Sequence, residues 1–287
     1  MMDLTSPKVI RSIQDKFGFT FKKGLGQNFL TSNDILEDIT NAADIDGGVI
    51  EIGPGFGVLT RALAENAEKV ISIELDERLL PVLKYTLSDF DNVKIVNADV
   101  LKLDLHSLIR EEFGSQKVSI AANLPYYITT PIITRLLEEK LPVKNIVVMV
   151  QKEVAERMAA EPSTKDYGAI TVLCKYFTKP QIVANVPSSL FVPPPKVDSA
   201  VLKLEVLDKP AVDVKDEKLF FRVVKAAFSQ RRKTLLNCLC ANFPINKTDM
   251  SELLLQLGID PKRRGETLSL EEFAATADAI KSFSEQP

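Results

Sequence analysis

The stretch Val49-Ile50-Glu51-Ile52-Gly53-Pro54-Gly55-Phe56-Gly57-Val58-Leu59-Thr60 decides the fold of this 287-residue chain. An apolar run typical of a buried β-strand meets three glycines, and apolar residues at helical spacing follow. Glycine suits such a turn because it tolerates positive φ and lets a ligand lie against the main chain. The stretch therefore predicts a strand, a tight turn and a helix start that together form a ligand site.

The spacing of the glycines narrows the class of ligand. A dinucleotide fingerprint counted from Gly53 requires Gly or Ala at position 58, where this chain has Val58. The phosphate-loop motif G-x-x-x-x-G-K-[ST] does not occur in the sequence. The turn therefore favours a ligand other than a dinucleotide or a nucleoside triphosphate.

Two further apolar runs, 70–76 and 93–99, end in carboxylates. Glu74 lies about 20 residues after the turn, where the second strand of a doubly wound sheet offers a carboxylate to ribose hydroxyls. Asp99 is suited to accept hydrogen bonds from the exocyclic amine of adenine. Three strand ends then converge on one nucleoside, a pattern that indicates S-adenosylmethionine. The alternative is that Glu74 and Asp99 cap helices or face water. It explains the residues together less well than it explains either residue alone.

The bulk properties are those of an ordinary globular protein with 45% hydrophobic and 26% charged residues. No uninterrupted apolar run reaches the ~18 residues that a membrane span needs, and Met1–Pro7 lacks the regions of a secretory signal. The three cysteines have no metal-ligand spacing and indicate reduced thiols. We expect a cytoplasmic monomer without a metal site or a membrane partner.

Strand and helix patterns alternate from Val49 onward, which is typical of a parallel sheet with crossover helices on both faces. The last two strands are joined by a proline-rich loop, so this pair can be antiparallel. Beyond about residue 208 the pattern contains helices only. We expect an α/β domain over 1–208 and a helical domain over 209–287. The candidate strands are 49–52, 70–75, 93–97, 118–122, 145–151, 181–186 and 199–207.

Capping signals mark several helix starts. Ser6-Pro7 predicts a short N-terminal helix that ends at Gly18, and Thr31-x-x-Asp34 resembles a capping box. In the helical domain we expect helices over about 216–243 and 248–257, and a last helix opened by the capping box Ser269-x-x-Glu272.

The predicted fourth strand ends in Asn123-Leu124-Pro125-Tyr126, next to the expected cofactor. Methylation of the N6 amine of adenine requires hydrogen-bond acceptors, because the lone pair is delocalised into the ring. Asn123 offers its side-chain oxygen, Pro125 its backbone carbonyl, and Tyr126 a face for stacking. No strong base is needed, since methyl transfer from a sulfonium creates an acidic ammonium. The alternative is that the tetrad is only a strand-ending turn.

The distribution of basic residues modifies the meaning of the net charge of -3, which by itself argues against a nucleic-acid partner. Two clusters stand out, and each is explained either as a nucleic-acid surface or as a solvated helix face. The clusters are Arg222, Lys225, Arg231, Arg232 and Lys233 without an intervening acid, and Lys262-Arg263-Arg264.

Five motifs spread in order over nearly the whole chain resemble one family. Together they resemble the bacterial small-subunit rRNA adenine dimethyltransferases, the kasugamycin-resistance family. The motifs are Gly24-Leu25-Gly26-Gln27-Asn28-Phe29-Leu30, Glu51-Ile52-Gly53-Pro54-Gly55, Asn123-Leu124-Pro125-Tyr126, Pro193-Pro194-Pro195-Lys196-Val197-Asp198-Ser199 and Phe228-Ser229-Gln230-Arg231-Arg232-Lys233-Thr234.

The resemblance implies a class I S-adenosylmethionine-dependent methyltransferase with an α/β fold. Its Rossmann-like sheet would have seven mostly parallel strands, followed by a small all-helical C-terminal domain. The implied reaction adds two methyl groups to N6 of each of two adjacent adenosines, in the hairpin loop near the 3′ end of 16S rRNA. The implied partner is the small ribosomal subunit, with a role in its biogenesis.

The resemblance also implies roles for individual residues. At the target adenine it places Asn123, Pro125 and Tyr126, with Phe191 as a second aromatic wall or, alternatively, as core packing. On the rRNA backbone it places Arg231, Arg232 and Lys233. The family usually has Asn where this chain has Tyr127, which leaves the role of that position in doubt. The implied cofactor-binding residues are Gln27, Asn28, Leu30, Gly53, Gly55, Glu74, Asp99 and Asn123.

Two other functions stay open from the residues. One is the related macrolide-resistance methyltransferase, which modifies large-subunit rRNA, although the triple proline and the Gln-Arg-Arg-Lys stretch favour the small-subunit enzyme. The other is an RNA-binding ribosome-assembly factor without catalysis. The intact tetrad argues against that as the sole role.

Overall fold

The computed structural model describes residues 2–19 and 28–285. The chain divides into two compact units, the first made of Met1–Ala155 and Lys179–Val206, the second of Glu156–Thr178 and Leu207–Pro287. The second unit contains the expected C-terminal helices, and the division after Val206 lies close to the expected boundary at 208. The second unit also includes Glu156–Thr178, which the single predicted boundary at 208 assigns to the first domain.

A seven-stranded sheet forms the centre of the first unit, in the order β4-β3-β2-β5-β6-β9-β7. Neighbouring strands from β4 to β6 pair in parallel, and β9 pairs with β6 in the antiparallel sense. All seven candidate strands are confirmed. They are β2 (Gly48–Ile52), β3 (Lys69–Glu74), β4 (Val93–Asn97), β5 (Val118–Asn123), β6 (Val143–Gln151), β7 (Thr178–Val186) and β9 (Ser199–Val206).

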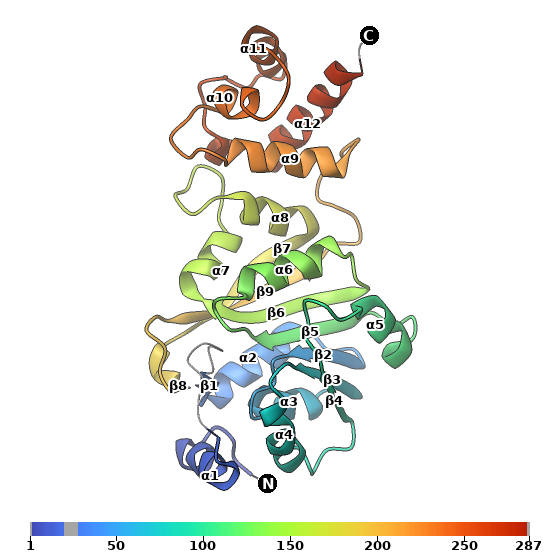
Figure 1. The fold of residues 1–287 in the computed structure, drawn as a ribbon, viewed down its shortest axis with the longest axis vertical. Helices are drawn as coiled ribbons and strands as arrows, with labels where there is room; N and C mark the ends of the chain where they lie inside the picture. Colours follow the sequence, from blue (N-terminus) through green and yellow to red (C-terminus); the bar gives the residue numbers. More distant parts are fainter. Residues whose placement is uncertain (1, 20–27, 286–287) are drawn as a thin grey trace. The chain divides into compact units, whose positions relative to one another are not determined.

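Helices connect the parallel strands, as the alternating pattern predicts (Figure 1). Because helices cover such a sheet, a central strand is apolar on both sides, and every residue of β2 is buried. Helix α2 packs against β5, β6 and β9. The connecting helices are α3 (Val58–Ala64), η2 (Glu77–Leu79) with α4 (Leu80–Thr86), α5 (Leu105–Phe113), α6 (Thr129–Glu138), and α7 (Lys152–Met158) with α8 (Ala169–Phe177).

The N-terminal region confirms one predicted helix, although the Ser6 side chain makes no capping hydrogen bond, and corrects the capping box predicted for the next helix. Helix α1 (Pro7–Phe17) starts after Ser6 and ends at Gly18, whose φ is 59°. Helix α2 (Asn33–Ala43) is capped by Ser32, not Thr31, because the Thr31 hydroxyl donates to the Leu190 carbonyl instead. The expected capping box at Thr31 is therefore wrong by one residue.

A second, two-stranded sheet was not predicted. Strand β1 (Phe29–Leu30) pairs antiparallel with β8 (Phe191–Val192), which follows the 3-10 helix η3 (Ser188–Leu190). Two-residue strands are too short to show a period in the sequence.

The second unit has an aromatic core between α8 and α9 (Glu217–Ala227). Tyr176 stacks on Phe220 with ring centroids 4.9 Å apart, and Phe177 stacks on Phe221. This packing explains why Glu156–Thr178 belongs to the helical unit. The remaining helices are α10 (Leu235–Cys240), α11 (Lys247–Gln256) and α12 (Leu270–Ser284), with the 3-10 helix η4 (Gly265–Thr267) before the last.

The single helix expected over about 216–243 is wrong, because the chain leaves the helix after Ala227 and starts a new one at Leu235. The Thr234 side chain accepts a hydrogen bond from Asn237 N and caps the new helix. Such a local cap competes with helix continuation.

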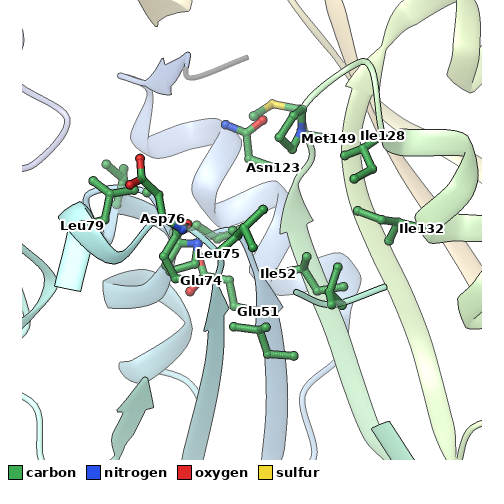
Figure 2. A pocket seen from close by; sticks show the side chains of 18 of the residues that line it. Glu51, Ile52, Glu74, Leu75, Asp76, Leu79, Asn123, Ile128, Ile132 and Met149 are labelled. Carbon is green, nitrogen blue, oxygen red and sulfur yellow. Dashed lines mark hydrogen bonds between the residues drawn. The ribbon is translucent and has the colours of Figure 1, made fainter. Parts of the chain in front are cut away.

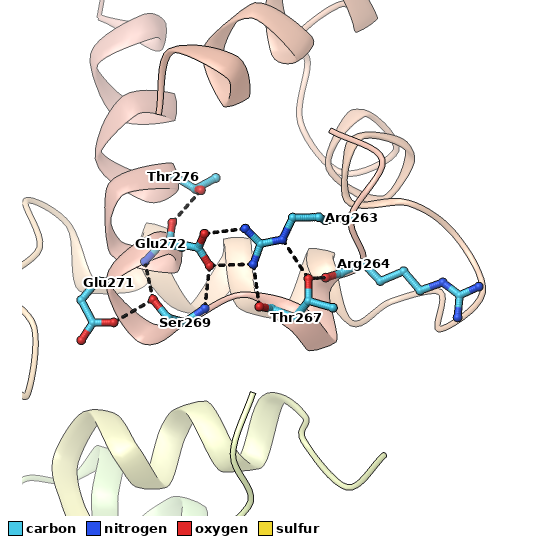
Figure 3. Close-up of polar contacts among 7 residues, drawn as sticks. All are labelled: Arg263, Arg264, Thr267, Ser269, Glu271, Glu272 and Thr276. Atoms are coloured by element: carbon cyan, nitrogen blue, oxygen red, sulfur yellow. Dashed lines mark hydrogen bonds and ion pairs between the residues drawn. The ribbon is translucent and has the colours of Figure 1, made fainter. Parts of the chain in front are cut away.

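The capping box at the start of α12 is confirmed and extended by an arginine (Figure 3). Ser269 N donates to Glu272 Oε2 at 2.8 Å, and Glu272 N donates to Ser269 Oγ at 3.2 Å. Arg263 forms a bidentate ion pair with the Glu272 carboxylate, at 2.5 and 2.9 Å, and donates to Thr267 O. The guanidinium keeps the pKa of Glu272 below its usual range. Arg263 thus has a structural task inside its unit.

No helix in the described part of the chain combines the length and apolarity that crossing a bilayer requires.

Candidate active site

The first unit holds a cavity of about 340 Å³ where the parallel strands β2, β3, β4 and β5 end. Its size falls in the range of small-molecule sites, and carboxyl ends of parallel strands are where open α/β sheets bind ligands. Figure 2 shows Glu74 and Asp76 on one side of the cavity, facing Asn123, Ile128 and Ile132 on the other.

The glycine turn presents bare backbone to this cavity. Gly53 has φ of 72°, and a Cβ added there would meet no atom within 4 Å. Gly55 has φ of 59°, and a Cβ added there would lie 2.9 Å from the Phe29 ring. Both glycines line the cavity, but only Gly53 leaves open space above its Cα. The predicted close approach of a ligand to the main chain therefore falls at Gly53.

Glu74 is the better ribose candidate of the two carboxylates at the end of β3. The Asp76 carboxylate is held by Arg78 through both oxygens, at 2.8 and 2.5 Å. Glu74 is 6% exposed and its Oε1 accepts from the Asp76 N–H at 2.7 Å. Burial raises the pKa of Glu74, and N–H groups of Asp76 and Gly55 oppose that rise.

Asp99 lies in the turn after β4 and lines the same cavity. Its Oδ1 accepts from Leu101 N at 2.9 Å, and its Oδ2 lies 3.5 Å from Lys102 Nζ in a solvent-exposed ion pair. The structure thus brings together two carboxylates that lie 25 positions apart in the sequence, as the strand pattern predicts.

The charged side chains among the described residues that line the cavity are all acidic. Carboxyl side chains line it, and none of the described residues that line it is Lys, Arg or His. Such a lining attracts a cation and repels phosphate groups. The carboxyl side chains are Glu51, Glu74, Asp76, Glu77 and Asp99.

Glu51 also lines the cavity, and the sequence analysis did not predict this role for it. It is 1% exposed, and its Oε2 accepts from the hydroxyls of Thr60 at 2.6 Å and Ser72 at 2.7 Å. Burial raises the pKa of Glu51 to about 7, against the two hydroxyl hydrogen bonds. A carboxyl group inside the apolar run 49–52 was the signal that could have found it.

The raised pKa of Glu51 predicts a pH-dependent stability. The folded protein keeps a proton that the unfolded chain releases above pH 4.5, so the free energy of unfolding falls between pH 4.5 and about 7. The shift corresponds to about 3 kcal/mol at most. Glu51→Gln stays neutral and accepts the same hydroxyls through its amide oxygen. Urea unfolding at pH 5 and pH 8 should therefore show a smaller loss of stability in Glu51→Gln than in the wild type. Equal losses would contradict the assignment.

Asn123 ends β5 and faces the cavity from the acceptor side (Figure 2). Its Nδ2 donates to the backbone carbonyl of Asn28 at 3.1 Å. With the nitrogen engaged, the side-chain oxygen is the atom left to accept a hydrogen bond from a substrate. Asn28 and Leu30 also line the cavity, whereas Gln27 lies outside the described residues.

Pro125 lies in the turn between β5 and α6, and the acceptor role expected of its carbonyl stays a prediction. Pro125 lines the cavity, but its oxygen already accepts from Ile128 N at 3.1 Å and from the Thr129 hydroxyl at 3.2 Å. A carbonyl oxygen has two lone pairs, and in this structure both face donors at the start of α6. Pro125 therefore shapes the turn into α6.

The two predicted aromatic walls do not line the cavity. The Tyr126 hydroxyl and Ser199 Oγ form a hydrogen bond of 2.8 Å, which fixes the half-buried ring at the start of β9. Burial raises the pKa of the Tyr126 phenol. Phe191 is 3% exposed, because β8 pairs with β1 and its ring packs in the core. Phe191 as an open wall is not observed, and the core-packing alternative describes its position.

Other lining residues were given no site role from the sequence, Tyr127 among them, whose role was left in doubt. Tyr127 is 58% exposed and lines the cavity, as do Ile128 and Ile132 of the α6 region. Their signal was weak, since apolar residues at the start of a helix are usually core residues.

The basic stretch Arg231-Arg232-Lys233 forms an exposed turn between α9 and α10. These three residues therefore lie in a turn and not on a helix face, and both the nucleic-acid surface and the solvated surface stay open for them. Arg231 Nη2 donates to the Lys165 carbonyl at 3.0 Å, within the second unit. In the other basic cluster, Arg263 is held by Glu272, so that cluster offers fewer charges than the sequence suggests.

The sheet order and the acid-lined cavity define a class I methyltransferase fold, and the predicted fold class is confirmed by solved structures. The chain belongs to the ribosomal RNA adenine dimethylase family, which it matches over residues 18–281. The family resemblance read from the five motifs is thereby confirmed.

The comparisons with individual proteins agree. The chain is 52% identical over 286 residues to ribosomal RNA small subunit methyltransferase A of Bacillus cytotoxicus, and 51% identical to that of Bacillus mycoides, covering 98% of each chain. It is similar to a dimethyladenosine transferase from Plasmodium falciparum, with a TM-score of 0.73, 29% identity and coverage of 86% and 95%. For the 23S rRNA methyltransferase ErmE the TM-score is 0.68, with 26% identity and coverage of 88% and 99%.

Proposed function

We propose that this protein transfers methyl groups from S-adenosylmethionine to N6 of two adjacent adenosines in the 3′-terminal hairpin loop of 16S rRNA. The observation that carries the proposal is the acid-lined cavity with Asn123 on its acceptor side. S-adenosylmethionine carries a sulfonium and an ammonium, whereas nucleotide cofactors carry phosphates that this lining repels.

Three residues of the cavity are each suited to a different part of the cofactor. Glu74 suits the ribose hydroxyls, Asp99 the adenine amine, and the open face of Gly53 the methionine part. Asn28 and Leu30 close the cavity from the N-terminal segment. When bound there, the cofactor supplies an electrophilic methyl group.

The acceptor side supplies orientation rather than a base. Asn123 accepts one N6 hydrogen of the target adenine and thereby directs the nitrogen lone pair toward the cofactor. The partly exposed ring of Tyr126, fixed by Ser199, offers a face on which the purine stacks. The only histidine, His106, is exposed and its ring nitrogen contacts the Glu139 carbonyl. The proton released on methylation passes to water.

The small subunit is the proposed substrate because relatives at 51–52% identity carry that name, whereas the similarity to the large-subunit enzyme ErmE is 26%. Hairpin-loop bases are accessible to such a site because extruding them costs little stacking energy. We place the reaction in the cytoplasm and assign the protein as a monomer with a role in small-subunit biogenesis.

Arg231, Arg232 and Lys233 are proposed to bind the rRNA backbone from their exposed turn. Replacing all three with Ala should weaken RNA binding and reduce the slope of log K against log salt by roughly two to three, since each phosphate contact contributes about 0.7–0.9. Filter binding between 50 and 300 mM salt measures the slope. The matched control is Lys209→Ala with Lys218→Ala and Lys247→Ala, which removes equal charge from exposed positions elsewhere in the second unit. A slope unchanged in the first variant, or changed equally in both, would leave the turn as ordinary solvated surface.

The function itself is tested by incubating the protein with labelled S-adenosylmethionine and small subunits that lack the modification, then mapping the labelled bases. Large subunits serve as the control substrate. We expect label on two adjacent adenosines of the small-subunit rRNA, as dimethyladenosine. Label on large-subunit rRNA would support the ErmE-like alternative, and RNA binding without label would support an assembly factor.

A further inference from the structure

Helix α6 carries one arginine whose guanidinium is used entirely inside the protein. Arg135 donates through Nη2 to the Leu103 carbonyl at 2.6 Å and through Nη1 to the Val100 carbonyl. Its Nε donates to Glu139 Oε1 at 2.5 Å, and the side chain is 20% exposed. The forked, planar guanidinium is suited to contact two carbonyls and a carboxylate at once.

The two carbonyls belong to the turn that carries Asp99. Within it, the Asp99 carbonyl accepts from Lys102 N at 2.9 Å and Leu103 N at 3.0 Å, and Asp99 Oδ1 accepts from Leu101 N. Val100 follows Asp99 directly and also lines the cavity. Arg135 therefore donates hydrogen bonds to this turn at Val100, directly after Asp99, and again at Leu103. These bonds limit the movement of the turn and of the Asp99 carboxylate that it carries.

The same helix holds the acceptor side. At its N-terminus, Ile128 N and the Thr129 hydroxyl bind the Pro125 carbonyl of the Asn123–Tyr126 tetrad. Ile132, one turn before Arg135, lines the cavity. Helix α6 thus contacts both the acceptor turn and the Asp99 turn.

We propose that Arg135 is a positioning residue that fixes the Asp99 carboxylate for recognition of the 6-amino group of the cofactor's adenine. This inference rests on the proposed function, because it takes the ligand to be an adenosine derivative. Arg135 touches neither substrate nor cofactor. It acts by holding the turn whose carboxylate selects a hydrogen-bond donor at position 6 of the purine.

The test compares two ligands that differ only at that position. S-adenosylhomocysteine has an amine there, and S-inosylhomocysteine has a carbonyl oxygen that faces the carboxylate unfavourably. Calorimetry gives the dissociation constant of each for the wild type, Arg135→Ala and Arg135→Lys. We expect the wild type to prefer the adenine compound. The preference should drop by roughly tenfold in Arg135→Ala, the scale of a lost hydrogen bond to a charged group. Arg135→Lys should recover part of it.

Two controls separate positioning from general loss of structure. Arg110→Ala removes an arginine of α5 that donates to Ser107 at 3.1 Å and does not contact the turn, so it should keep the wild-type preference. Glu139→Gln keeps the two carbonyl contacts of Arg135 and weakens only its ion pair, and it should give a small effect. If Arg135→Ala fails to fold, Arg135→Lys carries the test, because it removes the forked contacts with the Val100 and Leu103 carbonyls and should lower the preference more than Glu139→Gln does.

The outcomes are distinct. If Arg135→Ala weakens both ligands equally and keeps their ratio, or if Arg110→Ala lowers the ratio as much, Arg135 is merely structural and the inference is overturned while the proposed function stands. If the wild type binds neither ligand, or binds both equally, the adenosine site itself is overturned, and this inference with it.

Discussion

Asn123→Ala should reduce methyl transfer by about a hundredfold or more while RNA binding stays near the wild-type level. The side-chain oxygen of Asn123 is the proposed acceptor that draws the adenine nitrogen toward tetrahedral geometry, and the Asn123 side-chain nitrogen already donates to the Asn28 carbonyl. Removing one such preorganised group from an active site typically costs about 10²–10³ in rate. Single-turnover methylation of small subunits measures the chemical step, and filter binding measures the RNA affinity.

The chain offers a closely matched control for this substitution. Asn145 in β6 also donates through Nδ2 to a backbone carbonyl, that of Ala43, at 3.1 Å, but it does not line the cavity. Asn145→Ala therefore loses the same kind of hydrogen bond, and any loss of stability, without loss of an acceptor at the site. If Asn123→Ala lost RNA binding and activity in equal measure, or if Asn145→Ala lost activity per folded molecule as strongly, Asn123 would have no special part in the reaction.

Gly53→Ala should weaken cofactor binding by roughly tenfold to a hundredfold, the scale of the 1–3 kcal/mol that one added methyl group costs in a filled site. The added Cβ meets no protein atom within 4 Å and projects into the space that the methionine part of the cofactor is proposed to fill. Calorimetric titration with S-adenosylhomocysteine measures the affinity directly.

The backbone strain of this substitution can be subtracted with a second glycine. Gly258 has φ of 73°, against 72° for Gly53, and a Cβ added there also meets nothing within 4 Å. Gly258→Ala in the helical unit should therefore cost the same roughly 1–2 kcal/mol of folding stability and leave cofactor affinity unchanged. If the two variants lowered affinity by similar factors, strain rather than occupied space would explain the effect of Gly53→Ala.

The sequence predicted the sheet well because its signals are local. Continuous apolar runs such as Val49–Ile52, interrupted by glycines and carboxylates, identify buried parallel strands and the edge at which their ends meet. That edge brings Glu74, Asp99 and Asn123 together around one cavity, as the strand pattern predicts. Residues at the carboxyl ends of parallel strands are the part of a site that strand order alone determines.

The sequence did not predict features that depend on contacts between distant segments. Phe191 is buried because a two-residue strand pairs with Leu30, about 160 positions earlier, and so short a pairing leaves no period to read. Two further contacts likewise leave no pattern in the sequence. They are the hydrogen bonds of Arg135 to the Asp99 turn and the ion pair of Arg263 with Glu272. The break at Arg231–Lys233 was hidden because Thr234 caps a helix inside a run that reads as one helix.

The most direct test of the central claim is a structure of the protein with S-adenosylhomocysteine bound. We expect the ribose hydroxyls at the Glu74 carboxylate, the adenine amine at Asp99, and the homocysteine part over Gly53 with its sulfur facing Asn123. Binding of the ligand elsewhere, or a ribose beyond hydrogen-bond reach of Glu74, would contradict the claim that these strand ends form an adenosine-sulfonium site.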